Sequence, residues 1–426
     1  MNSDRAIVRS PLLAMWPLFL GVALMMLGNG LQATLLGVRS SLEDFDTAVI
    51  GAIQTAYYAG FLIGSRFTMR ALSRVGHIRV FAALASMAST AALLHVVFIN
   101  APTWFAMRLV TGFCMAGLYV VAESWLNDQA PPDARGRTLS IYMVVTMGSL
   151  TGGQFLLNVA DPISFELFII ASVLVSLSLV PMSLADSRAP AFAEAKPLPI
   201  RELWGVVPSG VVTMFLSGAA AATLFGIGPV YAARVGMSTR DISLFISASV
   251  IGATIFQLPI GALSDKLPRR SVIIAVAIGA TAASVYGVTT NGGFPGLIAM
   301  FAIGATSFPI YSLAIAYTND WVADDQRVGS SALLVMVNGI GAVSGPFIAS
   351  VLMRTYSNSM YFWMLATLHG VMAAYLLYRV MVMDAKPIEE QSTYRALPAR
   401  SSVGAAILGR RTVKPKKKSK PSESSR

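Results

Sequence analysis

Twelve long apolar runs, separated by short polar loops, make up most of the sequence. Each run is long enough to cross about 30 Å of hydrocarbon as an α-helix, and none alternates like a barrel strand. Helices are therefore the expected spanning structure, because unpaired backbone groups are costly in lipid. The runs lie at about 12–37, 46–65, 78–98, 103–126, 138–160, 164–184, 206–231, 241–263, 271–289, 294–318, 329–353 and 359–382. The pattern predicts an all-α membrane protein with twelve transmembrane helices.

A polar stretch near the middle of the chain splits the runs six and six. We expect a six-helix bundle at residues 1–190, a cytoplasmic linker at 191–205 and a second six-helix bundle at 206–383. The remaining residues, 384–426, are rich in lysine and cannot form a core, so they predict a basic, disordered cytoplasmic tail.

The two halves match each other in sequence at an offset of 192 residues. This offset pairs Gly60 with Gly252, Gly112 with Gly304 and, in a loop, Asp128 with Asp320. An even number of spans per half gives both halves the same orientation, so they are parallel repeats about an axis along the membrane normal. Two such bundles can rock about a central cavity, which is the mechanical requirement for alternating access.

Composition and charge support a membrane protein and argue against a nucleic-acid partner. Hydrophobic residues make up 55% of the chain and charged residues 12%, against about 25% charged in soluble proteins. The net charge is +11, but the basic residues lie in the tail and in short loops rather than on one soluble domain. With the N-terminus inside, 16 basic residues lie in inner loops and flanks and 4 in outer loops. We therefore expect both termini in the cytoplasm and the protein in the cell inner membrane.

Few residues are suited to catalysis or to metal binding. The single cysteine, Cys114, lies inside an apolar run, and the histidines have no partners at ligand spacing. No nucleotide-binding P-loop or metalloprotease motif occurs. We expect neither an enzyme nor a metal site or cofactor.

One loop carries a dense set of charged and small residues. Between the runs at 241–263 and 271–289 it presents, in order, Gly261, Asp265, Lys266, Arg269 and Arg270. This loop resembles the signature loop of the major facilitator superfamily, except that Pro268 replaces its second glycine. The resemblance covers the chain up to about residue 383.

The resemblance implies a gating role for this loop. Asp265 would latch against the positive N-terminus of the run at 329–353. Lys266 or Arg269 would approach Asp320. Such contacts would hold one face closed and break when it opens; solvated loop charges without such a role remain the alternative.

The equivalent loop of the first half departs from the family pattern. Ser73 stands where the family has an aspartate, whereas Arg74 and Gly76 remain. The first-half latch is therefore expected to be weaker, and Asp128 is a candidate partner for Arg74.

The run at 103–126 carries ionisable residues inside the membrane. Arg108, Gly112, Tyr119 and Glu123 share one helical stripe, with Arg108 and Glu123 about 22 Å apart along the axis, too far to pair. The spacing of Arg108 and Gly112 matches a second motif of the superfamily, which is associated there with proton coupling. Both charged residues are candidates for a substrate or proton path, with structural pairing of Arg108, or an interfacial place for Glu123, as alternatives.

The segment Glu-Ser-Trp-Leu-Asn at 123–127 resembles the YcaD-like branch of the superfamily, a group of inner-membrane transporters. This resemblance indicates a class and gives no substrate. Further polar side chains on several runs could surround a common axis, although interhelical hydrogen bonding would also explain them. They are Asn29, Gln32, Gln54, Tyr57, Thr146 and Asn338. Together they predict a mildly polar, largely uncharged pocket for a neutral or anionic solute, with Arg108 as an anion partner.

The sequence thus predicts a secondary active transporter that moves a small solute by alternating access, with proton coupling left open. A transport-inactive sensor or scaffold with the same fold is the alternative. The expected partners are a small-molecule substrate, the lipid bilayer and protons as the candidate coupling ion. We expect no nucleic acid, and we expect a monomer.

Overall fold

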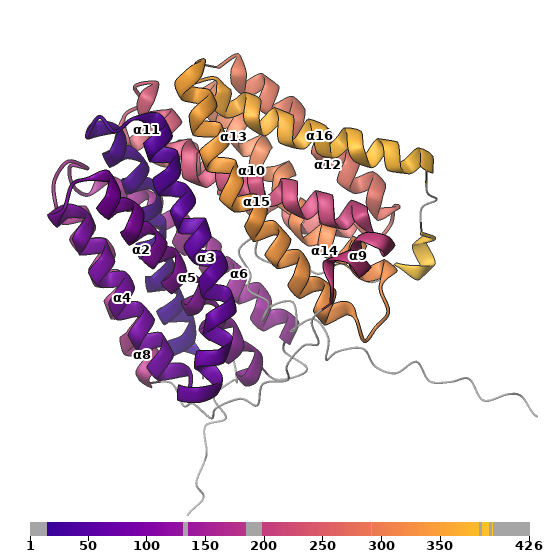
Figure 1. Ribbon diagram of the computed structural model, residues 1–426, viewed down its shortest axis with the longest axis horizontal. Coiled ribbons are helices and arrows are strands. Elements are labelled where there is room, and N and C mark those ends of the chain that lie inside the picture. Colours follow the sequence, from indigo (N-terminus) through magenta and orange to yellow (C-terminus); the bar gives the residue numbers. More distant parts are fainter. Residues whose placement is uncertain are drawn as a thin grey trace, which may run out of the picture.

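The computed structural model describes residues 15–130, 135–184, 198–290, 292–382, 386–391 and 394 (Figure 1). These residues contain no β-strand, and they form twelve spans that are long and apolar enough to cross a membrane. The predicted fold class, twelve transmembrane helices in two six-helix bundles, is confirmed.

The helices of the two bundles follow one another in chain order. The first bundle contains α2 (Trp16–Leu42), α3 (Thr47–Val75), α4 (His77–Val97), α5 (Ala101–Gln129), α6 (Arg135–Phe155) with the 3-10 turn η1 (Leu156–Asn158), and α7 (Glu166–Leu177) with α8 (Leu179–Leu184). The second contains α10 (Pro208–Arg234), α11 (Thr239–Ser264), α12 (Arg269–Val288), α13 (Gly293–Ser307) with α14 (Pro309–Trp321), α15 (Arg327–Thr355) and α16 (Met360–Val382). Two short elements, α9 (Ile200–Val206) and η2 (Ile388–Glu390), flank the second bundle.

Two boundaries differ from the sequence prediction for clear reasons. Helix α3 continues well past residue 65, because Arg66 and Arg70 point outward while Thr68 and Leu72 remain buried on the opposite side. The span expected at 294–318 is divided into α13 and α14 at Pro309, whose ring nitrogen has no hydrogen to donate to the preceding turn.

The linker and the tail contain more structure than composition suggested. Helix α9 lies within the expected linker at 191–205, although residues 185–197 lie outside the described part of the chain. In the tail, residues 386–391 and Tyr394 have defined positions against the second bundle, so disorder from residue 384 onward is wrong for them. Residues 395–426 of the predicted tail lie outside the described residues.

Close helix contacts inside the first bundle depend on glycine. A Cβ added at Gly112 of α5 would lie 1.9 Å from the carbonyl oxygen of Tyr57, and one at Gly60 of α3 would lie 2.0 Å from that of Leu109. Real Cβ atoms do not approach so closely, so α3 and α5 touch backbone to backbone only because both positions lack a side chain.

The second bundle repeats this contact at the positions that the 192-residue offset predicts. A Cβ at Gly304 of α13 would lie 1.9 Å from the carbonyl oxygen of Ser249, and one at Gly252 of α11 would lie 2.1 Å from that of Phe301. The sequence repeat therefore corresponds to the same helix pairing in both bundles.

Polar contacts between the bundles gather at one end of the molecule, which we call the Asp46 end. Arg354 Nε lies 3.0 Å from Asp46 Oδ2, and Arg234 donates a 3.1 Å hydrogen bond to the carbonyl of Phe45. The opposite end, which we call the Asp265 end, carries the loop between α11 and α12. Figure 1 shows the two bundles converging at the Asp46 end and diverging toward the Asp265 end.

We predict that Gly112→Ala destabilises the protein, because the added methyl group forces α3 and α5 apart; overpacking of this kind typically costs about 1–3 kcal/mol. Gly148→Ala on α6 is the matched control, since a Cβ there has no neighbour within 4 Å. Thermal unfolding of the purified protein in detergent measures both. Equal unfolding temperatures for the two variants would refute the proposed backbone contact.

Candidate functional site

A cavity lies between the two bundles, with walls from both. The empty space inside it is about 690 Å³ when its open mouth is included. Helix α3 lines one side, and α10, the α13–α14 junction and α15 line the other. The lining residues are Tyr57, Tyr58, Phe61, Leu62, Ser65, Gly218, Ala221, Ala222, Phe225, Phe308, Tyr311, Val335, Asn338, Gly339 and Ala342.

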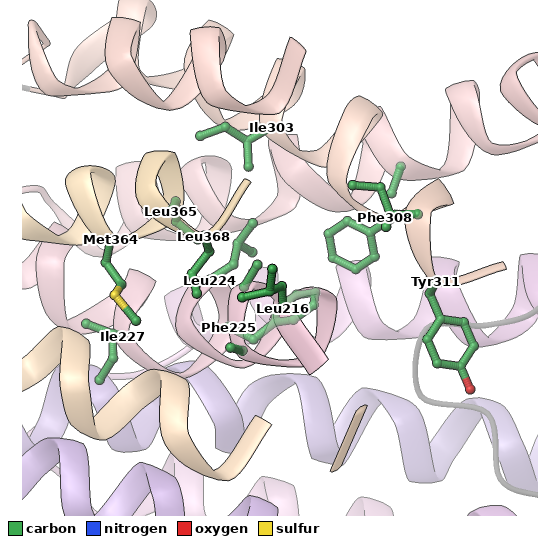
Figure 2. Close-up of a cluster of buried hydrophobic side chains, with 14 of the residues drawn as sticks. Leu216, Leu224, Phe225, Ile227, Ile303, Phe308, Tyr311, Met364, Leu365 and Leu368 are labelled. Atoms are coloured by element: carbon green, nitrogen blue, oxygen red, sulfur yellow. The ribbon is translucent and has the colours of Figure 1, made fainter. Parts of the chain in front are cut away.

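The chemistry of this lining is aromatic and neutral. Six of the lining side chains are aromatic, and none of the lining residues is an acid or a base. Figure 2 shows three of them, Phe225, Phe308 and Tyr311, beside the packed apolar core of the second bundle. A cavity with these walls favours a solute with an apolar planar part and no net charge.

Polar side chains of the lining have defined partners, and Asn338 and Tyr58 are two of them. Asn338 Nδ2 donates a 3.1 Å hydrogen bond to the carbonyl of Met214, which fixes the amide at the cavity wall. The hydroxyl of Tyr58, in the first bundle, lies 3.5 Å from the carbonyl oxygen of Ala222, in the second. Of the predicted path residues, only Tyr57 and Asn338 line the cavity.

Arg108 lies in a layer behind the cavity wall. Its guanidinium donates a 2.9 Å hydrogen bond to Gln54 Oε1, and its Cζ atom lies 4.3 Å from the centre of the Tyr57 ring. The Tyr57 hydroxyl in turn lies 3.4 Å from Asn29 Oδ1. Tyr57 thus separates Arg108 from the cavity, and the guanidinium supports the ring from behind.

Three buried side-chain amides near this layer keep hydrogen-bonding capacity. The nitrogen atoms Asn29 Nδ2, Gln32 Nε2 and Gln54 Nε2 have no acceptor among the described residues. The amide groups make this layer polar, and Arg108 is its one charged group among those described here. Buried donors without an acceptor are costly, so each of these nitrogens favours a polar partner. The structure places all three inside the protein, as expected for an interior path, but outside the cavity lining.

Glu123 is fully buried inside the first bundle, neither in the cavity nor exposed at an interface. Its carboxylate accepts a 3.3 Å hydrogen bond from the Tyr142 hydroxyl on α6, and Thr146, one turn along, is also buried. Tyr119 on the same stripe donates its hydroxyl to the sulfur of Met26 at 2.9 Å. These predicted path residues therefore form an interior polar seam between α2, α5 and α6.

The loop of the second bundle holds a buried charge cluster. The Arg269 guanidinium forms an ion pair with Asp320, both side chains being 2% exposed or less, and reaches Asp265 at 3.3 Å. Arg270 is buried and donates a 3.3 Å hydrogen bond to the carbonyl of Arg379. Lys266 is exposed and contacts no polar group in the described part of the chain. Of the two expected partners for Asp320, Arg269 is the one present.

Asp265 has a different partner from the one that the resemblance implied. Its carboxylate accepts a 2.7 Å hydrogen bond from the backbone N–H of Tyr394, and the Tyr394 ring covers Gly261. No hydrogen bond of Asp265 among the described residues reaches the start of α15. The expected latch onto α15 is not formed among the described residues, where α11 packs chiefly on α13 and α6.

The first-bundle loop has a simpler structure. Gly76 takes a φ of 84°, which favours glycine, and joins α3 directly to α4. Arg74 is exposed and pairs with no described residue, and the side chain of Asp128, its candidate partner, lies outside the described residues. His77, which follows Gly76, connects this loop to α5 through a 3.1 Å contact with Ser124.

Sequence reasoning did not point to the part of the aromatic lining that comes from the second bundle. Phe225 and Phe308 look in sequence like any apolar residue that faces lipid or core. The repeat held one usable signal: Tyr311, which pairs with Tyr119 at the 192-residue offset, lines the cavity although Tyr119 does not. For metals, the described residues contain no group of three or more His, Cys, Asp or Glu side chains placed to bind an ion.

Comparison with known proteins gives a consistent result. The family model described as Major Facilitator Superfamily matches residues 18–239 and 210–419. A Yersinia enterocolitica protein named as an uncharacterized MFS-type transporter is 26% identical over 392 residues, which cover 89% of this chain and 97% of the relative. The Escherichia fergusonii MFS-type transporter YcaD is 27% identical over 360 residues, covering 84% and 93%. The crystal structure of the nucleoside transporter NupG has a similar fold, with a TM-score of 0.70 at 13% identity, over 86% of this chain and 99% of that one.

Proposed function

The chain belongs to the major facilitator superfamily of membrane transporters, and we propose that it is a secondary active transporter that carries a small neutral solute with a planar apolar part by alternating access. One observation supports this proposal above the others. The cavity between the bundles is lined by six aromatic side chains and by no charged one. A solute held there would contact both bundles, so its binding can be sensitive to how the bundles sit against each other.

We place the Asp265 end on the cytoplasmic side of a bacterial inner membrane. Most basic residues of the loops and flanks lie at this end, which the positive-inside rule assigns to the cytoplasm. Since the contacts between the bundles gather at the Asp46 end, the state described here is open toward the cytoplasm.

The contacts between the two bundles at the Asp46 end are suited to opening. The Arg354 and Asp46 side chains are 60% and 41% exposed, and an exposed pair of this kind contributes only about 0–1 kcal/mol. Inside each bundle, by contrast, helices touch backbone to backbone at paired glycines. The energetic contrast favours motion of whole bundles against each other over rearrangement within a bundle.

A neutral solute fits the geometry better than an anion. The sequence predicted Arg108 as the partner of an anion. In the structure, Tyr57 lies between the Arg108 guanidinium and the cavity. Nucleosides, which the name of NupG gives as its substrate, combine a planar base with no net charge. They therefore belong in the panel of solutes to be tested.

A transport-inactive sensor or scaffold is the alternative function. A scaffold has no physical need for an open cavity that is lined by residues of both bundles, and the cavity therefore favours transport. Solute movement by the purified protein in proteoliposomes distinguishes the two functions.

We predict that neutral planar solutes, nucleosides among them, stabilise the purified protein in a thermal-shift screen and that organic anions of similar size do not. Asn338→Ala should weaken the apparent affinity of the best solute about fivefold, the value of one hydrogen bond of ordinary strength. Ile255→Ala, on the exposed face of α11, is the control that should leave affinity unchanged. Stabilisation by anions alone, or equal affinities for the two variants, would exclude the proposed solute class.

We further propose that Glu123 carries the proton if solute flow is coupled to protons. An ionisable group buried within a membrane span is costly and is therefore a functional candidate by default. The Tyr142 hydroxyl gives the Glu123 carboxyl a hydrogen-bonded neighbour. Glu123→Gln keeps the shape and cannot exchange a proton. It should abolish solute accumulation driven by a pH gradient in proteoliposomes while preserving solute exchange at equal pH. Glu166→Gln, at an exposed helix start, is the control; gradient-driven accumulation by Glu123→Gln would overturn the assignment.

A further inference from the structure

The chain beyond α16 folds back onto the Asp265 end of the second bundle. We call residues 386–391 together with Tyr394 the strap. Its middle is the 3-10 turn η2 at Ile388–Glu390, and its two anchors are Lys386 and Tyr394. Each anchor reaches a residue of the charge cluster around Arg269.

Lys386 binds beside the buried ion pair. Its ammonium group donates a hydrogen bond to the backbone carbonyl of Asp320, the residue whose carboxylate pairs with Arg269. The same ammonium lies 5.9 Å from the centre of the Trp321 ring and 3.7 Å from the Glu390 carboxylate within the strap. Lys386 therefore attaches the strap to the end of α14.

Tyr394 occupies a groove between α11 and α14. Its backbone N–H donates a 2.7 Å hydrogen bond to Asp265 Oδ1, at the C-cap of α11. Its hydroxyl lies close to Gln257 on α11 and Ser312 on α14, and burial raises the pKa of Tyr394 to about 12. The residue thus bridges two helices and the loop that follows one of them.

The groove has room for this ring only because Gly261 has no side chain. A Cβ at Gly261 would lie 2.1 Å from Cε1 of Tyr394 and 2.2 Å from its Cδ1. Gly261 belongs to the loop motif, so the strap uses the same glycine and the same aspartate that the gating interpretation assigns to the loop. While the strap is docked, the Tyr394 ring covers Gly261 and its N–H is bonded to Asp265, so the loop cannot rearrange at these two residues until the strap leaves.

We propose that the strap is an autoinhibitory contact that holds the second-bundle loop in the arrangement seen here, with the Asp265 end open. The inference rests on the proposed alternating access. Release of the strap frees Asp265 and Gly261 and allows the Asp46 end to open more often.

The first arm of the test measures docking of the strap in the full-length protein. Hydrogen–deuterium exchange should be slow at the Tyr394 amide in the wild type, because that N–H is bonded to Asp265. Tyr394→Ala removes the ring, and Gly261→Ala fills the groove from the opposite side; both should accelerate exchange in this peptide by about tenfold. Tyr394→Phe keeps the ring and the N–H donor and is the matched control. Unchanged exchange in both test variants would overturn the proposal.

The second arm measures the conformational equilibrium without using transport. Ser350 is buried at the Asp46 end against Gly51, and in a Cys114→Ser background Ser350→Cys can react with an impermeant maleimide from outside only when that end opens. Tyr394→Ala and Gly261→Ala should each raise the labelling rate about fivefold, as the loss of one hydrogen bond to the favoured state predicts. Tyr394→Phe should label at the background rate.

The outcomes separate the strap from the proposed function. Faster exchange with an unchanged or lower labelling rate makes the strap a purely structural element and overturns the autoinhibition. Labelling that is absent in the wild type and in every variant means that the Asp46 end never opens. In that case alternating access itself fails, although the exchange data still show whether the strap docks.

Discussion

Contact between helix backbones inside each bundle is the constraint on which the rest of this structure depends. In lipid, apolar side chains gain little by packing on each other rather than on acyl chains, so close approach and dispersion hold the helices together. The glycine pairs at α3–α5 and α11–α13 provide that approach. Gly153 of α6 and its repeat equivalent Gly345 of α15 provide it again. A Cβ at Gly153 would lie 2.4 Å from the carbonyl oxygen of Leu27 on α2, and one at Gly345 would lie 2.3 Å from that of Ala219 on α10. Each bundle is thereby a stiff unit.

The cavity results from the side chains that the two bundles place opposite each other. Both bundles contribute aromatic side chains to its walls, Tyr57 and Tyr58 from α3 and Phe225 from α10 among them. The small residues Gly218, Ala221 and Ala222 of α10 leave space between these rings. The charged residues lie outside the cavity: Arg108 lies behind Tyr57, and Arg269 and Asp320 form an ion pair at the Asp265 end.

Much of this architecture could be predicted from sequence because its physical signals are local. Apolar runs of spanning length predicted the helices, and the 192-residue offset predicted which positions of the two bundles are equivalent. The lining aromatics of the second bundle could not be predicted, since Phe225 facing a cavity and Phe225 facing lipid produce the same hydropathy. The partner of Asp265 could not be predicted either, because Tyr394 lies 129 residues away in a segment whose composition indicates disorder.

Transport as proposed here depends on the movement of two stiff bundles against each other about the cavity. Distances between paired spin labels in proteoliposomes test it most directly, with Leu42 and Ser357 marking the Asp46 end, Ser73 and Asp324 marking the Asp265 end, and Leu42 and Ile99 serving as a pair within the first bundle. All are substituted by cysteine in a Cys114→Ser background. The account predicts that a bound solute or a change in its gradient lengthens the Leu42–Ser357 distance and shortens the Ser73–Asp324 distance, with the Leu42–Ile99 distance constant. Fixed distances at both ends, or a change within the first bundle equal to the change between bundles, would contradict it.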